Sequence, residues 1–161
     1  MGVSIDYLVD GGLWRSQMLE HSAFPYRTDD DFRAIIAPFL AEGLERSEAV
    51  LAVTTGRNIE LLRGELGTDA RSVEFVDASC FYSTPIAALG AYREFFDSSL
   101  KRGAAWIRVV GEPTWADRPE AEVRLWTRYE SLLNLVFAAS PVTIVCPYDA
   151  RSVAAEVVSH A

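Results

Sequence analysis

The alternation of short apolar segments with amphipathic stretches constrains the fold of this chain more than any other feature. Segments rich in β-branched and aromatic residues occur at 21–26, 49–54, 72–76, 105–110 and 142–146. Stretches with a helical period lie at 30–45, 58–66, 85–101, 119–139 and 150–159. Several apolar segments lack an apolar–polar alternation, as do strands covered on both faces. The order predicts βαβ units and a three-layer α/β sandwich with a mostly parallel central sheet.

Composition and charge set the size and class of the molecule. The chain has 161 residues, half of them apolar, which is enough for one domain core. Residues 1–19 show no sustained period and are expected to form an N-terminal arm, and residues 20–161 the folded domain. A formal net charge of −8 disfavours nucleic acid and anionic lipid as partners. With no bilayer-length apolar stretch and no secretory signal in the sequence, we predict a cytoplasmic protein.

The loop after the fourth apolar segment is the clearest candidate site, because parallel sheets bind ligands outside the carboxyl ends of their strands. It reads Gly111-Glu112-Pro113-Thr114-Trp115 and is followed by Arg118 and a long predicted helix. Glu112 can aim a carboxylate over the sheet, and Trp115 offers a flat apolar surface. The same residues also fit a turn in which Trp115 caps the core and Glu112 pairs with Arg118.

Polar residues border the apolar side of the following helix. Glu122, Trp126, Glu130 and Asn134 recur every four residues and form one stripe. Glu130 and Asn134 could anchor the polar end of a ligand or form structural hydrogen bonds. If Glu130 is buried, we expect Arg118 or backbone N–H groups of the Gly111 loop to satisfy it, because an unpaired buried carboxylate is costly.

Cysteine and metal chemistry have little support in the residue spacing. We expect Cys146-Pro147-Tyr148-Asp149 to end the last strand and begin the last helix, which brings Tyr148 to the crevice. A cysteine nucleophile needs a base, but His21 is expected at the start of the first strand and His160 in the terminal helix. No two of the histidines and cysteines have metal-ligand spacing. We therefore expect no catalytic residue, no bound metal and no cofactor.

The first two predicted units resemble the RecA-like ATPases of the KaiC kind, in which a strand and a phosphate loop lead into a helix ending in a Gly-Leu turn. Gly43-Leu44 matches that turn, but residues 25–31 read Pro-Tyr-Arg-Thr-Asp-Asp-Asp where the ATPases have their phosphate loop. No glycine there frees backbone N–H groups, no lysine reaches a phosphate, and three carboxylates repel one. We expect a RecA-like domain whose phosphate loop is lost.

The whole set of features resembles the MEDS domain, a sensory domain named for methanogen and methylotroph proteins and the DcmR regulator. It is most similar to the version in actinobacterial RsbA-type anti-sigma regulatory proteins, over roughly residues 21–161. The matching motifs are His21-x-Ala23 with Tyr26-Arg27, Phe39 with Gly43-Leu44, Asp77, Gly111-Glu112-Pro113-Thr114-Trp115 with Arg118, Glu130 with Leu132-Leu133-Asn134 and Phe137, and Cys146-Pro147-Tyr148-Asp149.

The resemblance implies a non-catalytic sensory module that binds a small, partly apolar ligand and controls a kinase-like or anti-sigma output. It assigns to the ligand pocket or its supporting network the residues Tyr26, Glu112, Trp115, Arg118, Glu130, Asn134 and Tyr148. Because the chain stops near the end of the resemblance, it is either an excised sensory domain or acts on a separate sigma-regulatory protein.

Three functions remain open at this point. The first is the ligand-sensing regulatory domain, and the second is a pure protein-interaction module in a sigma-factor regulatory pathway. The third is a small enzyme or nucleotide binder that uses Asp77 and Glu112 in the crevice. We also expect a homodimer, because paired outputs are common in signalling chains and a parallel sheet leaves edges that can pair.

Overall fold

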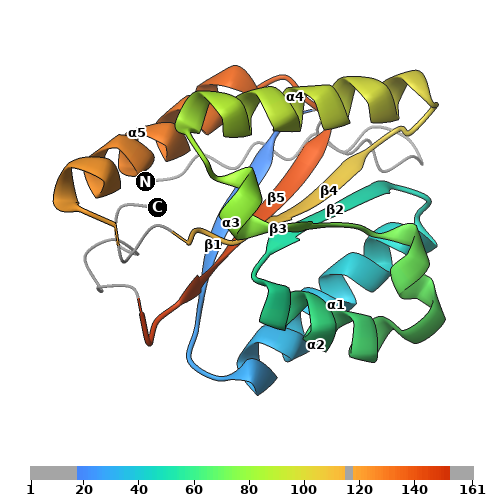
Figure 1. Cartoon of the computed structure of the whole chain (residues 1–161). Helices are drawn as coiled ribbons and strands as arrows, with labels where there is room; N and C mark the ends of the chain where they lie inside the picture. The colour runs from blue at the N-terminus through green and yellow to red at the C-terminus, as the bar shows by residue number, and fades with distance from the viewer. Residues whose placement is uncertain (1–17, 115–117, 153–161) are drawn as a thin grey trace, which may run out of the picture.

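A five-stranded parallel sheet lies between two layers of helices in the computed structural model, which describes residues 18–114 and 118–152 (Figure 1). The strands are β1 (Glu20–Tyr26), β2 (Ala49–Thr54), β3 (Glu74–Asp77), β4 (Ile107–Gly111) and β5 (Val142–Asp149). Their spatial order is β1-β5-β4-β2-β3, and every neighbouring pair is parallel.

Helices cover both faces of this sheet. One layer holds α1 (Asp29–Glu45) and α2 (Gly56–Leu66), and the other holds α4 (Pro85–Lys101) and α5 (Glu120–Val136) (Figure 1). A 3₁₀ helix (Gly67–Ser72) precedes β3 and the short α3 (Ala78–Phe81) follows it, and neither was predicted. The predicted three-layer α/β sandwich with a parallel sheet is confirmed. None of the described helices is long and apolar enough to cross a membrane.

The end of the last strand differs from the prediction. β5 continues past Cys146 to Asp149 because β1 extends the ladder, with Pro25 opposite Tyr148 and Tyr26 opposite Asp149. The prediction that Cys146 ends the strand is therefore wrong. Residues 150–152 form a turn, and the remainder of the helix predicted at 150–159 lies outside the described residues, as does the predicted arm up to residue 17.

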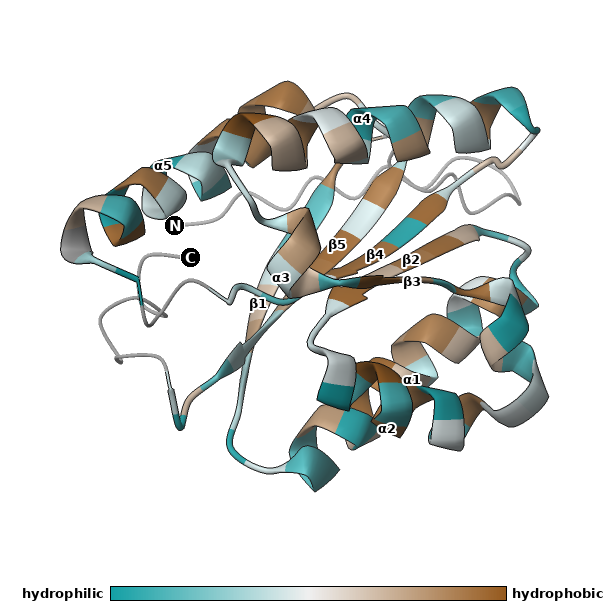
Figure 2. Ribbon diagram, in the orientation of Figure 1, coloured by the Kyte–Doolittle hydropathy of each residue, from teal (hydrophilic) through white to brown (hydrophobic). Residues whose placement is uncertain are grey.

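The sheet separates two apolar cores. Side chains alternate between the faces along a strand, so Ile107 and Val109 of β4 pack with α4 and α5, whereas Val110 packs toward α1. The α4/α5 core is rich in aromatic rings, including Tyr92 and Trp126. Figure 2 shows apolar residues along the central strands. Neighbouring residues of one strand therefore face different surroundings.

A buried arginine accounts for the glycine near the end of α1. Arg108 of β4 is 3% exposed, and its guanidinium donates to Glu48 Oε2 at 2.6 Å and to both Glu42 Oε2 and the Phe39 carbonyl at 2.8 Å. A Cβ atom at Gly43 would lie 2.7 Å from Arg108 Cδ. The helix can approach β4 only where a side chain is missing.

Gly43→Ala is expected to lower the free energy of unfolding by about 1 to 3 kcal/mol, because the added methyl group displaces the pinned Arg108 side chain. Gly90→Ala in α4 is the matched control, since a Cβ atom there would meet nothing within 4 Å. The control should raise the free energy of unfolding by up to about 1 kcal/mol through helix propensity. Urea denaturation measures both, and equal stabilisation of the two variants would contradict the packing argument.

Candidate functional site

The start of α1 is capped by side chains of the protein itself. Thr28 Oγ1 accepts a hydrogen bond from Asp31 N at 3.0 Å. The Asp31 carboxylate in turn accepts from Thr28 N at 3.0 Å and from Arg27 N at 3.1 Å. These are backbone donors of the kind that bind an anion at a helix start, and Asp29 and Asp30 add negative charge. The protein's own side chains therefore occupy this anion-binding position.

Glu112, directly after β4, is a buried carboxylate that collects donors from three other elements. Its Oε1 accepts from Tyr26 Oη at 2.5 Å, and its Oε2 accepts from Thr54 Oγ1 and from Thr55 N at 3.1 Å. Asn58 Nδ2 of α2 donates to it at 3.0 Å. Burial, followed by the charge of Glu112, raises the pKa of the Tyr26 phenol. Glu112 thus joins the carboxyl ends of β1, β2 and β4.

This carboxylate lies at a cavity of about 340 Å³ outside the carboxyl ends of the strands. Its buried lining combines the polar groups of Tyr26, Asn58 and Glu112 with the apolar ring of Pro113. Two ion pairs stand at its rim: Arg57 Nη2 lies 2.5 Å from Asp29 Oδ2, and Arg151 Nη2 lies 2.7 Å from Asp149 Oδ2. The crevice therefore combines a polar floor with a charged rim.

A second polar cluster lies on the opposite, α5-covered face of the sheet. Cys146 Sγ lies 3.1 Å from His21 Nε2, and Glu130 Oε2 lies 3.7 Å from the same nitrogen. His21 Nδ1 lies 2.8 Å from Asn134 Oδ1. Burial lowers the pKa of His21, raises that of Glu130 to about 7 and raises that of Cys146. The expectation that no histidine lies near Cys146 is wrong, because β1 and β5 are neighbours.

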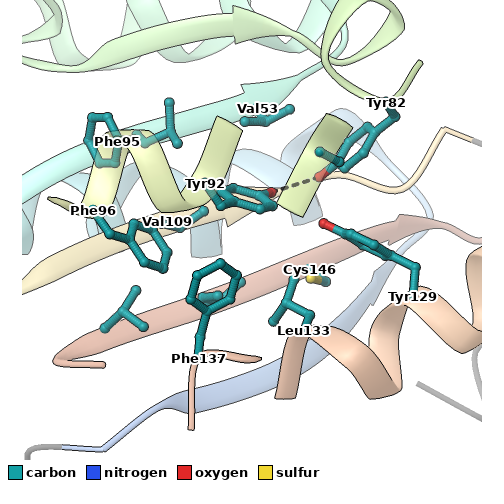
Figure 3. Packing of buried hydrophobic residues seen from close by; sticks show 14 of the residues in the cluster. Val53, Tyr82, Tyr92, Phe95, Phe96, Val109, Tyr129, Leu133, Phe137 and Cys146 are labelled. Carbon is teal, nitrogen blue, oxygen red and sulfur yellow. Dashed lines mark hydrogen bonds between the residues drawn. The ribbon is translucent and has the colours of Figure 1, made fainter. Parts of the chain in front are cut away.

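Tyrosine hydroxyl groups gather beside this cluster. Tyr82 Oη and Tyr92 Oη are 2.9 Å apart, and Figure 3 shows the hydroxyl of Tyr129 turned toward them with Cys146 close by. A Cβ atom at Gly111 would lie 2.7 Å from Tyr92 Oη and 2.9 Å from Tyr82 Oη. The missing side chain of Gly111 makes room for these hydroxyl groups.

The structure places the predicted site residues in separate groups. Tyr26 and Glu112 meet at the crevice, whereas Glu130 and Asn134 meet His21 on the other face. Tyr148 is buried in the core of that second face. Trp115 lies outside the described residues. His21, Thr54 and Asn58 were not predicted as site residues, because their partners are distant in the chain and only strand order brings them together.

The expected Arg118–Glu130 contact is not formed. Arg118 Nη2 instead donates to the Tyr82 carbonyl at 2.8 Å, and Arg118 Nη1 lies 3.5 Å from Glu122 Oε2. Its guanidinium stacks over Trp126, 5.3 Å from the ring centroid. Glu130 Oε2 accepts no hydrogen bond from any residue that the structure describes. The contact cannot form because Arg118 lies at the N-terminal end of α5, whereas Glu130 lies in the middle of α5 and faces β1 and β5.

Fold and site together define a class of protein. It is a three-layer α/β domain in which side chains cap the start of α1 and a buried carboxylate lies at the crevice. The family model described as MEDS, MEthanogen/methylotroph, DcmR Sensory domain, matches residues 20–161. The chain therefore belongs to the MEDS family of sensory domains, which indicates a sensory or regulatory role. No curated protein matches the chain in sequence.

Tyr26→Phe is expected to lower the free energy of unfolding by about 1.5 to 3 kcal/mol, because it removes a donor from the buried Glu112 carboxylate. Tyr148→Phe is the matched control, since Tyr148 is equally buried but its hydroxyl forms no hydrogen bond with any residue in the described ranges. Chemical denaturation followed by circular dichroism should show a smaller loss for the control. Similar losses of unfolding free energy in the two variants would show that the Tyr26–Glu112 hydrogen bond adds no particular stability.

Magnesium complexes of ATP and GTP are expected neither to bind at micromolar concentration nor to be hydrolysed, because Thr28 and Asp31 occupy the donors at the start of α1. Isothermal titration calorimetry and phosphate release measure both properties. Micromolar affinity that disappears in Arg27→Ala or Thr28→Ala, but not in Thr84→Ala at the capped start of α4, would overturn this interpretation.

Proposed function

We propose that this domain senses a small, partly apolar ligand with a polar group and relays its binding to a kinase-like or anti-sigma output. The observation that carries the proposal is the cavity of about 340 Å³ beside Glu112, at the place where parallel sheets bind ligands. The family match supports the sensory part. The same arrangement supports a non-catalytic role, because both oxygens of the Glu112 carboxylate are engaged by hydrogen-bond donors of the protein.

The chemistry of the crevice favours a ligand that carries a hydroxyl or carboxylate group. Tyr26 and Pro113 contribute apolar surface, and the polar floor can orient one ligand group. Arg57 is 70% exposed in its side chain and is held only at the rim by Asp29, so an anionic ligand can exchange with that partner. A ligand in the 300 Å³ range is a small molecule.

Relay to a partner would use the turn that follows β5. Arg151 and Ser152 line the cavity, and Arg151 also lies 3.5 Å from Asp29 at the start of α1. A ligand that rearranges these rim ion pairs would shift the turn against α1. The structural change is thereby presented at the surface, where an output partner can read it.

Short-chain alcohols, aldehydes and carboxylates serve as probes in a titration followed by amide chemical shifts. The largest shifts are expected at residues 26, 55–58, 112–114 and 149–152. Arg57→Ala should weaken binding of the carboxylates about tenfold, the loss typical of one charge-assisted contact. Arg63→Ala is the control, because Arg63 is an exposed, ion-paired arginine of the same helix outside the cavity. Shifts elsewhere, or equal effects of both variants, would reject the crevice as the sensory site.

A pure protein-interaction module is the second candidate, and the outer face of α5 favours it. Leu125, Leu132 and Val136 lie on one helical stripe and are 49%, 44% and 38% exposed. Contiguous exposed apolar surface is typical of a protein-contact face. Under this alternative the probe titration leaves the crevice amides unshifted, which separates the two functions in a single experiment.

A further inference from the structure

We propose that His21, Glu130 and Cys146 form a binding site for a zinc-type divalent cation on the α5 face of the sheet. The site lies across the sheet from the crevice and does not depend on a ligand there. It was not expected from residue spacing, because His21 and Cys146 are 125 positions apart. The neighbouring strands β1 and β5 supply two of its residues, and α5 supplies the third.

The distances between the three candidate ligand atoms fit one small cation. The imidazole nitrogen, thiol sulfur and carboxylate oxygen all lie within 4.8 Å of one another. His21 Nε2 is 3.1 Å from Cys146 Sγ and 3.7 Å from Glu130 Oε2. Two ligands on a tetrahedral zinc ion are roughly 3.4 to 3.6 Å apart, given bond lengths of about 2.0 to 2.3 Å. The two distances from His21 Nε2 differ from that spacing by a few tenths of an ångström. The distance from Cys146 Sγ to Glu130 Oε2 lies within 4.8 Å and would have to close by up to about 1.2 Å.

Asn134 orients the histidine for this purpose. Asn134 Oδ1 can only accept a hydrogen bond, and it lies 2.8 Å from His21 Nδ1. His21 Nδ1 therefore carries the proton. The lone pair of Nε2 then faces Cys146 and Glu130. Histidine ligands of metals usually donate their second ring N–H to such an acceptor, which fixes the tautomer and the ring plane. The supporting contact of a metal-binding histidine is therefore already present.

The Glu130 carboxylate is a second, independent observation that indicates a cation site. Its side chain is 9% exposed, and its Oε2 faces His21 but has no hydrogen-bond partner among the described residues. No lysine or arginine within residues 18–114 and 118–152 pairs with it. An unpaired buried carboxylate is costly, and a cation coordinated by the carboxylate and the Cys146 thiolate would remove that cost.

The donor set indicates the class of metal. One nitrogen, one sulfur and one oxygen are ligands that zinc accepts, whereas calcium and magnesium require oxygen ligands. Three protein ligands leave a fourth tetrahedral position for water or a small molecule. Because β1 is the edge strand and Asn134 is exposed, the cluster lies near the surface and an ion can reach it.

A nucleophilic cysteine would use the same Cys146, His21 and Asn134 side chains, but the surroundings favour a metal. Cys146 is only 4% exposed, so a substrate cannot approach its sulfur. A neighbouring carboxylate opposes formation of a free thiolate, whereas it adds to the affinity for a cation. The two arrangements are separated in the test below.

Cobalt(II) is the spectroscopic probe for the full chain after treatment with a chelator and a reductant. One equivalent should produce the visible bands of tetrahedral cobalt and a near-ultraviolet thiolate charge-transfer band, and zinc should bleach both. Cys146→Ser should abolish the charge-transfer band, and Cys80→Ser should leave it unchanged because Cys80 is the exposed cysteine elsewhere. Asn134→Ala should weaken zinc binding by about 10- to 100-fold, as loss of a contact behind a histidine ligand does.

X-ray absorption on the zinc-loaded parent protein keeps the test independent of whether the variants fold. It should show one sulfur neighbour at about 2.3 Å and nitrogen or oxygen neighbours at about 2.0 to 2.2 Å. A spectrum without sulfur, no binding at stoichiometric zinc, or a charge-transfer band that persists in folded Cys146→Ser would overturn the proposal. Rapid alkylation of Cys146 that zinc does not slow would instead identify a nucleophilic cysteine and equally reject the metal site.

Discussion

The buried charge of Glu112 is the constraint on which the carboxyl end of the sheet depends. A carboxyl group that is 2% exposed must be met by hydrogen-bonding partners. They come from Tyr26 at the end of β1, from Thr54 and Thr55 at the end of β2, and from Asn58 in α2. Satisfying one charge therefore sets the mutual position of three strands and a helix. The same contacts give the crevice a polar floor where an apolar one would otherwise be expected.

Strand geometry then divides the chemistry of the domain between two faces. Gly111 and Glu112 are adjacent, yet the first leaves space for the hydroxyl groups of Tyr82 and Tyr92 under α4, while the second points to the crevice beside α2. β1 behaves in the same way, with His21 in the cluster under α5 and Tyr26 at the crevice. Both proposed sites consequently share β1.

The start of α1 shows how side chains can satisfy the backbone donors with which a helix start binds an anion. A phosphate loop uses free backbone N–H groups at a helix start, and here Thr28 and Asp31 satisfy those groups within the chain. The capping box of α1 therefore engages donors that would otherwise be open to an anion. The contacts available to a ligand at this end of the sheet are the rim arginines and the Glu112 carboxylate.

The amino-acid sequence by itself determined the layers of the molecule and the order of its elements, because apolar periodicity and cap residues are local signals. β2 and α4 were predicted at both ends, since their boundaries coincide with those of the apolar run at 49–54 and with the Pro85 start of the helix. Tertiary structure decided which polar residues meet. Strand order places β1 beside β5 and therefore brings His21 close to Cys146. Tyr26 and Glu130 lie on opposite faces of the sheet, so the residues expected to share one pocket form two separate sites. No local pattern encodes this, because each contact joins segments far apart in the chain and depends on how the strands are ordered in space.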